Sequence, residues 1–106
     1  MLQKADVLVV VPALNEAASI TQVLRDIQSN GFDALVVDDG STDSTASIAR
    51  ESQASVVSLP LNSGVGGALR CGFRYAVEKG YSAIIQCDAD GQHLSQHLDD
   101  LLQASN

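Results

Sequence analysis

Four short apolar runs alternate with amphipathic segments along the chain. The first run is continuous and rich in β-branched residues, as expected of a strand that is covered on both faces. Glycine, proline and asparagine punctuate the boundaries between runs and segments. The predicted strands are Val7–Val11, which Pro12 would end, Ala34–Val37, Ser55–Leu59 and Tyr81–Cys87.

A helix is predicted after each strand, because apolar residues recur there at helical spacing. The predicted limits are an Asn15 cap to Asn30-Gly31, a Ser41 or Thr42 cap to about Ser52, the residues after Gly64 to Gly80, and Leu94–Gln103. In the third helix one face would be apolar. That face would consist of Val65, Leu69, Phe73, Ala76 and Val77.

This alternation predicts an α/β fold, a Rossmann-like parallel sheet of about four strands with helices on both faces. The 106 residues are enough for a single domain. In such a sheet, ligands bind at the carboxyl ends of the strands. The loops that would share this edge are Pro12–Glu16, Asp38–Asp43, Leu61–Gly66 and Asp88–Gln92.

The charge of the chain narrows the choice of ligand. Thirteen acidic residues against six Lys and Arg give a net charge of −7, which argues against electrostatic binding to nucleic acid or to an anionic membrane surface. A nucleotide remains compatible if a divalent cation neutralises its phosphates. The two cysteines match no metal or redox spacing, and the run Leu8–Val11 is too short to span a membrane. We therefore expect a cytoplasmic location.

The acidic segment after the fourth strand is a candidate metal site. Asp88 and Asp90 are two residues apart, so their side chains can converge in an extended segment, and Gln92 continues the spacing. Carboxylate and amide oxygens suit Mg²⁺ or Mn²⁺ rather than zinc. The alternative interpretation is a solvated acidic loop.

A second acidic pair, Asp38-Asp39, follows the second strand. Gathering like charges along one sheet edge costs stability unless a cation or hydrogen-bond donors offset it, which favours a binding site. The pair could also be only a turn that leads into a helix cap. Asp43 fits that turn well, and we place it outside the candidate site.

Four motifs occur in order: V-V-V-P-A-L-N-E (9–16), V-V-D-D-G-S-T-D (36–43), N-S-G-V-G-G-A (62–68) and D-A-D-G-Q-H (88–93). Together they resemble the amino-terminal, nucleotide-binding half of a family 2 glycosyltransferase with the GT-A fold. Within that family the dolichyl- and polyprenyl-phosphate mannosyl- and glucosyltransferases are the most similar group. The resemblance implies that residues 1–106 form one nucleotide-sugar-binding domain, truncated at its carboxyl side.

The resemblance also implies which residues meet the nucleoside diphosphate sugar. The residues that would lie along its base and ribose are Pro12, Ala13, Asn15 and Glu16. Asp38 and Asp39 would hydrogen-bond the base and ribose, and Gly40 would let the ligand approach closely. Gly66 would also lie against the nucleotide sugar. No catalytic residue is assigned.

For the metal, the resemblance implies that Asp88 lies near the ribose and the cation, while Asp90 and Gln92 hold the cation against the diphosphate. The implied reaction is inverting transfer from a GDP- or UDP-sugar to a lipid-phosphate or glycan acceptor, with polyprenyl phosphate favoured. A lipid acceptor would place the longer protein at the cytoplasmic face of a membrane.

Two alternatives stay open. One is a non-catalytic nucleotide-binding fragment. The other is a receiver-like Mg²⁺-binding domain, which is less favoured because Pro12-Ala13-Leu14, rather than an acidic pair, follows the first strand. If the domain is truncated, the fourth strand would be an exposed sheet edge through which two copies could associate.

Overall fold

The computed structural model describes residues 3–60 and 64–89. The predicted helix Leu94–Gln103 and the predicted metal ligands Asp90 and Gln92 lie outside them. The elements in order are η1 (Lys4–Asp6), β1 (Val7–Ala13), α1 (Ile20–Ser29), β2 (Asp33–Asp38), α2 (Thr45–Glu51), β3 (Ser55–Ser58), α3 (Gly64–Lys79) and β4 (Ala83–Gln86). Among the described helices, none has both the length and the apolar character needed to cross a bilayer.

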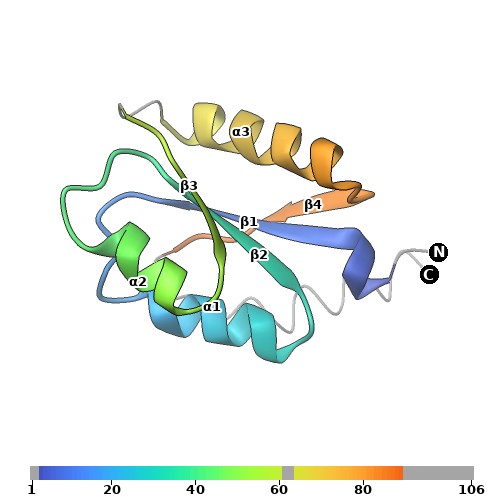
Figure 1. The fold of residues 1–106 in the computed structure, drawn as a ribbon, viewed down its shortest axis with the longest axis horizontal. Coiled ribbons are helices and arrows are strands. Elements are labelled where there is room, and N and C mark those ends of the chain that lie inside the picture. The colour runs from blue at the N-terminus through green and yellow to red at the C-terminus, as the bar shows by residue number, and fades with distance from the viewer. Residues whose placement is uncertain (1–2, 61–63, 90–106) are drawn as a thin grey trace.

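The strands form one parallel sheet in the order β3-β2-β1-β4 (Figure 1). β1 pairs with β2 from Leu8↔Asp33 to Ala13↔Asp38, and with β4 from Val7↔Ala83 to Val10↔Gln86. The predicted Rossmann-like sheet is confirmed. Because all strands run the same way, the ends of β1, β2 and β4 lie along one edge.

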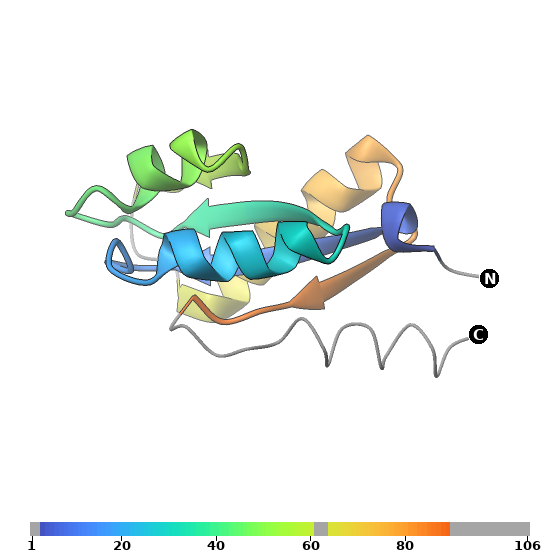
Figure 2. The same cartoon turned by 90° about the horizontal axis from the view of Figure 1, so that it is seen from below.

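Helices cover both faces of the sheet, as predicted. α1 and α2 pack on one face and α3 packs on the other (Figures 1 and 2). Successive residues of β1 alternate between the two cores, so Val9 and Val11 face α1 while Leu8 and Val10 face α3. A strand buried on both faces explains why the first run is apolar throughout.

The prediction that Pro12 ends the first strand is wrong. β1 continues to Ala13, and Pro12 pairs in register with Val37. Residues two apart in a strand direct their backbone groups to the same side, and the Val10 oxygen accepts a hydrogen bond from Cys87 N at 3.0 Å. The nitrogen of Pro12 therefore faces the β4 side, where the pairing of β1 with β4 has already ended at Val10. Proline is tolerated because no ladder hydrogen bond needs its missing N–H.

The predicted caps of the first two helices are also wrong. α1 begins at Ile20 after an N-cap at Ser19, and α2 begins at Thr45 after an N-cap at Ser44. Before α1 the chain makes a turn in which the Glu16 oxygen accepts from the backbone nitrogens of residues 19 and 20, at 3.1 and 2.9 Å. Residues 15, 41 and 42, which favour caps in general, serve instead to join two loops, as described below.

The predicted apolar face of α3 is only partly right. Ala76 is buried and Leu69 is half-buried, but Phe73 and Val77 are 58% and 62% exposed. The residues nearest the sheet are small. A Cβ placed on Gly72 would stand 2.6 Å from Val10 Cγ1, so α3 lies close against β1 and turns its larger apolar side chains away.

Candidate functional site

A pocket of about 230 Å³ opens at the carboxyl ends of the strands. It is lined by residues from the end of β1 and the following loop, from the end of β2, and from the first turns of α3. The lining residues are Pro12, Ala13, Leu14, Glu16, Asp39, Gly64 and Ala68. The fold thus brings together several of the predicted nucleotide-binding residues from distant parts of the chain.

Asp38 and Asp39 are buried at this edge, with only 6% and 5% of their surfaces exposed. Asp38 Oδ1 accepts a hydrogen bond from Ser41 N at 3.1 Å, and Asp39 Oδ2 accepts one from Gly64 N at 2.8 Å. Buried carboxylates are costly unless such donors compensate them. Asp39 therefore lines the pocket with its side chain held by a hydrogen bond from the start of α3. Asp38 instead stabilises the turn that contains Ser41.

Asn15 does not line the pocket. Its backbone adopts a left-handed φ of 55°. Its Oδ1 accepts hydrogen bonds from the backbone nitrogens of Thr42 and Asp43 at 2.8 and 3.3 Å, and its own backbone nitrogen donates to Ser41 Oγ at 2.9 Å. Asn15 thus fastens the loop after β1 to the loop after β2. Its predicted contact with a base or ribose stays a prediction.

The same two loops are joined a second time around Thr45. Its hydroxyl accepts a hydrogen bond from Glu16 N at 2.9 Å and donates to the Asp43 carboxylate, which also accepts from Ala17 N at 3.2 Å. The hydrogen bond from the Thr45 side chain holds the pKa of Asp43 below its ordinary value. Asp43 serves the turn, as expected from the sequence. Thr45 carries no sequence signal beyond an ordinary helix start.

The two predicted site glycines differ. Gly40 has a φ of 86°, a conformation that side chains disfavour, so the turn after Asp39 needs glycine. Gly66 lies in the first turns of α3 and is exposed, and a Cβ there would meet nothing within 4 Å. Packing gives no reason for glycine at position 66, and its contact with a nucleotide sugar stays a prediction.

The D-A-D segment begins at Asp88, two residues after β4 ends at Gln86. Cys87 and Ala89 are buried, and the Asp88 side chain between them is exposed, with Oδ1 3.4 Å from Gln86 Nε2. Within residues 3–60 and 64–89 no three His, Cys, Asp or Glu side chains are gathered. The other two predicted ligands, Asp90 and Gln92, lie outside this part of the chain. An exposed carboxylate at the strand edge fits an oxygen-ligated Mg²⁺ or Mn²⁺.

Ser19 connects this segment to the pocket, a role that the sequence did not predict. Its Oγ lies within hydrogen-bonding distance of the Ala89 oxygen and 3.2 Å from Glu16 Oε2. A serine that precedes an apolar helical segment is typical of a helix cap. Nothing in the sequence therefore indicates a contact between Ser19 and Ala89, which are seventy positions apart.

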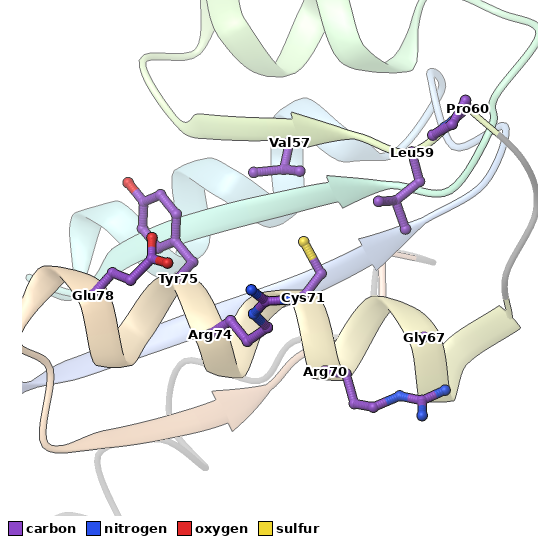
Figure 3. A pocket seen from close by; sticks show the side chains of 9 residues that line it. All are labelled: Val57, Leu59, Pro60, Gly67, Arg70, Cys71, Arg74, Tyr75 and Glu78. Atoms are coloured by element: carbon purple, nitrogen blue, oxygen red, sulfur yellow. The ribbon is translucent and has the colours of Figure 1, made fainter.

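A larger pocket of about 710 Å³ lies elsewhere, between α3 and β3 (Figure 3). None of the predicted site residues lines it. The lining residues are Val57, Leu59, Pro60, Gly67, Arg70, Cys71, Arg74, Tyr75 and Glu78. Figure 3 shows Arg70 pointing away from β3. This pocket does not include the acidic strand ends, and we place the candidate site in the smaller one.

The chain was also compared with known proteins. The chain is 37% identical over 106 residues to the undecaprenyl-phosphate mannosyltransferase of Micrococcus luteus, covering 92% of this chain and 43% of the relative. It is 31% identical over 112 residues to the UDP-N-acetylglucosamine–dolichyl-phosphate N-acetylglucosaminyltransferase of Methanococcus voltae, covering 89% of this chain and 45% of the relative.

Its fold matches that of Mycobacterium tuberculosis glucosyl-3-phosphoglycerate synthase, solved in complex with Mn²⁺, UDP and glucosyl-3-phosphoglycerate. The TM-score is 0.63 and the identity is 31%, over 83% of this chain and 36% of that protein. This chain thus spans less than half the length of each of these relatives. The expected fold, the amino-terminal part of a GT-A fold, is confirmed. Because the family model described as glycosyl transferase family 2 matches residues 8–106, the chain belongs to that family.

Proposed function

We propose that this chain is the donor-binding half of a metal-dependent, inverting glycosyltransferase that uses a GDP- or UDP-sugar. The observation that carries the proposal is the pocket in which Glu16 and Asp39 lie beside the apolar Pro12 and Leu14. An apolar wall suits the flat face of a base, and the carboxylates suit its hydrogen-bonding edge. The family assignment sets aside the receiver-like alternative.

The pocket chemistry favours some bases over others. Carboxylates only accept hydrogen bonds, so they pair with bases that present N–H donors. Uracil offers a ring N–H, and guanine offers a ring N–H and an amino group. Cytosine and adenine offer only an amino group at this edge, and their ring nitrogens are acceptors whose lone pairs would face the carboxylate. Asp39 is held by Gly64 N before any ligand arrives, which lowers the ordering cost of binding. These features support uridine or guanosine donors.

A divalent cation completes the proposal. A chain with a net charge of −7 and buried acids at the pocket would repel a diphosphate unless a cation lay between them. Asp88, with Asp90 and Gln92, would hold Mg²⁺ or Mn²⁺. When bound, the metal would neutralise the diphosphate and stabilise it as the leaving group. The presence of Mn²⁺ and UDP in the M. tuberculosis relative supports this assignment.

The names of the relatives also support the acceptor. Both the M. luteus and the M. voltae proteins are named for transfer to a polyprenyl-type phosphate. A phosphate oxygen is already ionised near neutral pH and needs no strong base. It would attack the anomeric carbon opposite the diphosphate and form a new C–O bond. The old C–O bond would break with its electron pair leaving on the nucleoside diphosphate, which inverts the configuration. Such an acceptor would place the whole protein at the cytoplasmic face of a membrane.

Calorimetric titration tests the proposal. UDP, GDP, ADP and CDP should be titrated into the chain with Mn²⁺, with Mg²⁺ and with EDTA. We expect UDP or GDP to bind more tightly than ADP and CDP, and more tightly with metal than with EDTA. Equal binding of all four nucleotides, or no binding, would contradict it. Binding without sugar transfer to polyprenyl phosphate by the longer protein would favour the non-catalytic alternative.

A further inference from the structure

The N-terminus of α1 carries a serine whose hydroxyl is not used for capping. Ser19 is the N-cap residue, with φ −115° and ψ −16°, and its side chain makes no cap hydrogen bond. A serine in this position ordinarily accepts a hydrogen bond from a backbone N–H of the first turn. Here the hydroxyl lies instead between the Ala89 oxygen and Glu16 Oε2. Since it has one proton, it donates to one of them at a time.

The two acceptors belong to different parts of the site. Glu16 lines the pocket, and its backbone nitrogen is held by Thr45 Oγ1 at 2.9 Å. Ala89 is the middle residue of the D-A-D segment, is only 4% exposed, and directly follows the exposed Asp88. Ser19 thus stands between the loop that would hold the nucleoside and the segment that would hold the metal.

We propose that Ser19 is a positioning residue that holds Asp88-Ala89, the described part of the D-A-D segment, in place relative to the nucleotide pocket. The proposal rests on the proposed function. A carbonyl in a buried residue needs a donor, and Ser19 supplies one to Ala89. Cys87 and Ala89 anchor the apolar side of the segment in the core beneath α1. The Ser19 hydroxyl adds a hydrogen bond, which is directional and therefore limits rotation of the backbone at Asp88.

Metal binding is sensitive to such rotation. Mg²⁺ demands near-ideal geometry with oxygen ligands at about 2.0–2.1 Å, so a carboxylate displaced by a fraction of an ångström binds less well. Recognition of the base does not pass through Ala89, and the contact of the Ser19 hydroxyl with Glu16 Oε2, at 3.2 Å, is the longer of its two contacts. Loss of the Ser19 hydroxyl should therefore reduce the part of the nucleotide affinity that depends on the metal, and leave the metal-independent part.

The chain supplies a matched control for this experiment. Ser44 is the N-cap of α2, also makes no side-chain cap hydrogen bond, and is exposed. Ser44→Ala removes the same hydroxyl from the same kind of position. Ser19→Thr keeps a hydroxyl at position 19, and Ser19→Cys keeps a side chain of similar size but replaces the strong donor with a weak one.

Affinities for UDP and GDP should be measured by calorimetry in Mn²⁺ and in EDTA for the wild-type chain and these variants. For Ser19→Ala we expect the gain in affinity from Mn²⁺ to fall about tenfold, the scale of one lost hydrogen bond. Its affinity in EDTA should stay within about twofold of wild type. Ser19→Thr and Ser44→Ala should keep the full gain. If Ser19→Ala fails to fold, Ser19→Cys should show the same selective loss.

Suppose that the wild-type chain does gain affinity from Mn²⁺. Two results would then overturn this inference without overturning the proposed function. One is a Ser19→Ala variant, or a Ser19→Cys variant in its place, that keeps the full gain. The other is a variant that loses affinity equally in Mn²⁺ and EDTA, which would indicate a general structural role. A wild-type chain that gains nothing from Mn²⁺ would overturn the proposed function and this inference together.

Discussion

Asn15 Oδ1 accepts a hydrogen bond of 2.8 Å from the backbone nitrogen of Thr42, across 27 residues of sequence. The same oxygen accepts a second one from Asp43 N at 3.3 Å, while the Asn15 backbone holds a left-handed φ of 55°. One residue thus combines an unusual backbone conformation with the side-chain acceptor that joins the two loops around the pocket.

Asn15→Ala should therefore destabilise the chain by about 1–3 kcal/mol, since it removes the acceptor and strains the backbone. Asn15→Gly should cost less, because glycine accepts positive φ, and Asn15→Asp should cost least, because it keeps an acceptor and Asp tolerates this conformation. Urea unfolding measures all three. A stability for Asn15→Ala equal to that of wild type would contradict the bracing role.

Asp39→Asn should weaken binding of UDP or GDP by about 1.5–3 kcal/mol, the range for a hydrogen bond to a charged group. The loss should be the same in Mn²⁺ and EDTA, because the base rather than the metal is affected. Asp38→Asn should cost affinity as well if both acids contact the nucleoside, as the family resemblance implies.

The control for this pair is Glu51→Gln, which removes one negative charge from an exposed position at the end of α2. Unchanged nucleotide affinity in both aspartate variants would mean that Asp38-Asp39 forms only a turn that leads toward α2.

Gly72→Ala should destabilise the fold by about 1–3 kcal/mol, because its Cβ would stand 2.6 Å from Val10 Cγ1 and force α3 away from β1. Gly66→Ala is the matched control in the same helix, since its Cβ would meet nothing within 4 Å. It should be neutral or stabilising by up to about 1 kcal/mol. Thermal unfolding separates the two.

The same Gly66→Ala variant also tests the predicted contact of Gly66 with the nucleotide sugar. A variant with wild-type stability and weakened UDP or GDP affinity would support that contact. Wild-type affinity would remove Gly66 from the site.

Asp90→Asn should act through the cation. It keeps one oxygen but removes the charge that offsets the metal, so the gain in diphosphate affinity from Mn²⁺ should shrink sharply. Affinity in EDTA should change little. Asp99→Asn removes the same charge from a position outside the predicted site. If the two variants titrate alike with UDP and GDP in Mn²⁺, D-A-D is a solvated acidic loop.

Self-association remains a prediction. In the described part of the chain β4 is an edge strand, and Phe73 and Val77 of the neighbouring α3 are mostly exposed. Unpaired edges and exposed apolar side chains favour association of two copies. Analytical ultracentrifugation should show concentration-dependent dimers, and Phe73→Glu should weaken them. A chain that stays monomeric at high concentration would argue against this edge as an interface.

The sequence by itself determined the sheet. The continuous apolar run at Val7–Val11 required a strand buried on both faces, and short connections required parallel pairing through crossover helices. That topology places Asp38-Asp39 and Asp88 at one edge of the sheet. These inferences rest on local periodicity and on the few ways in which such elements can connect.

Only the tertiary structure decided the strand ends, the helix orientation and the side-chain hydrogen bonds, because these depend on residues distant in sequence. Pro12 stays in β1 because β4 has stopped pairing there, and α3 places Gly72 so close to Val10 that a Cβ would not fit. Asn15 is predicted to cap a helix, yet its Oδ1 accepts a hydrogen bond from Thr42 N. Ser19 is the N-cap residue of α1, yet its hydroxyl lies against the Ala89 oxygen. A residue type specifies which hydrogen bonds a side chain can make. Only the packed fold specifies which partner lies within reach, because that partner comes from another part of the chain.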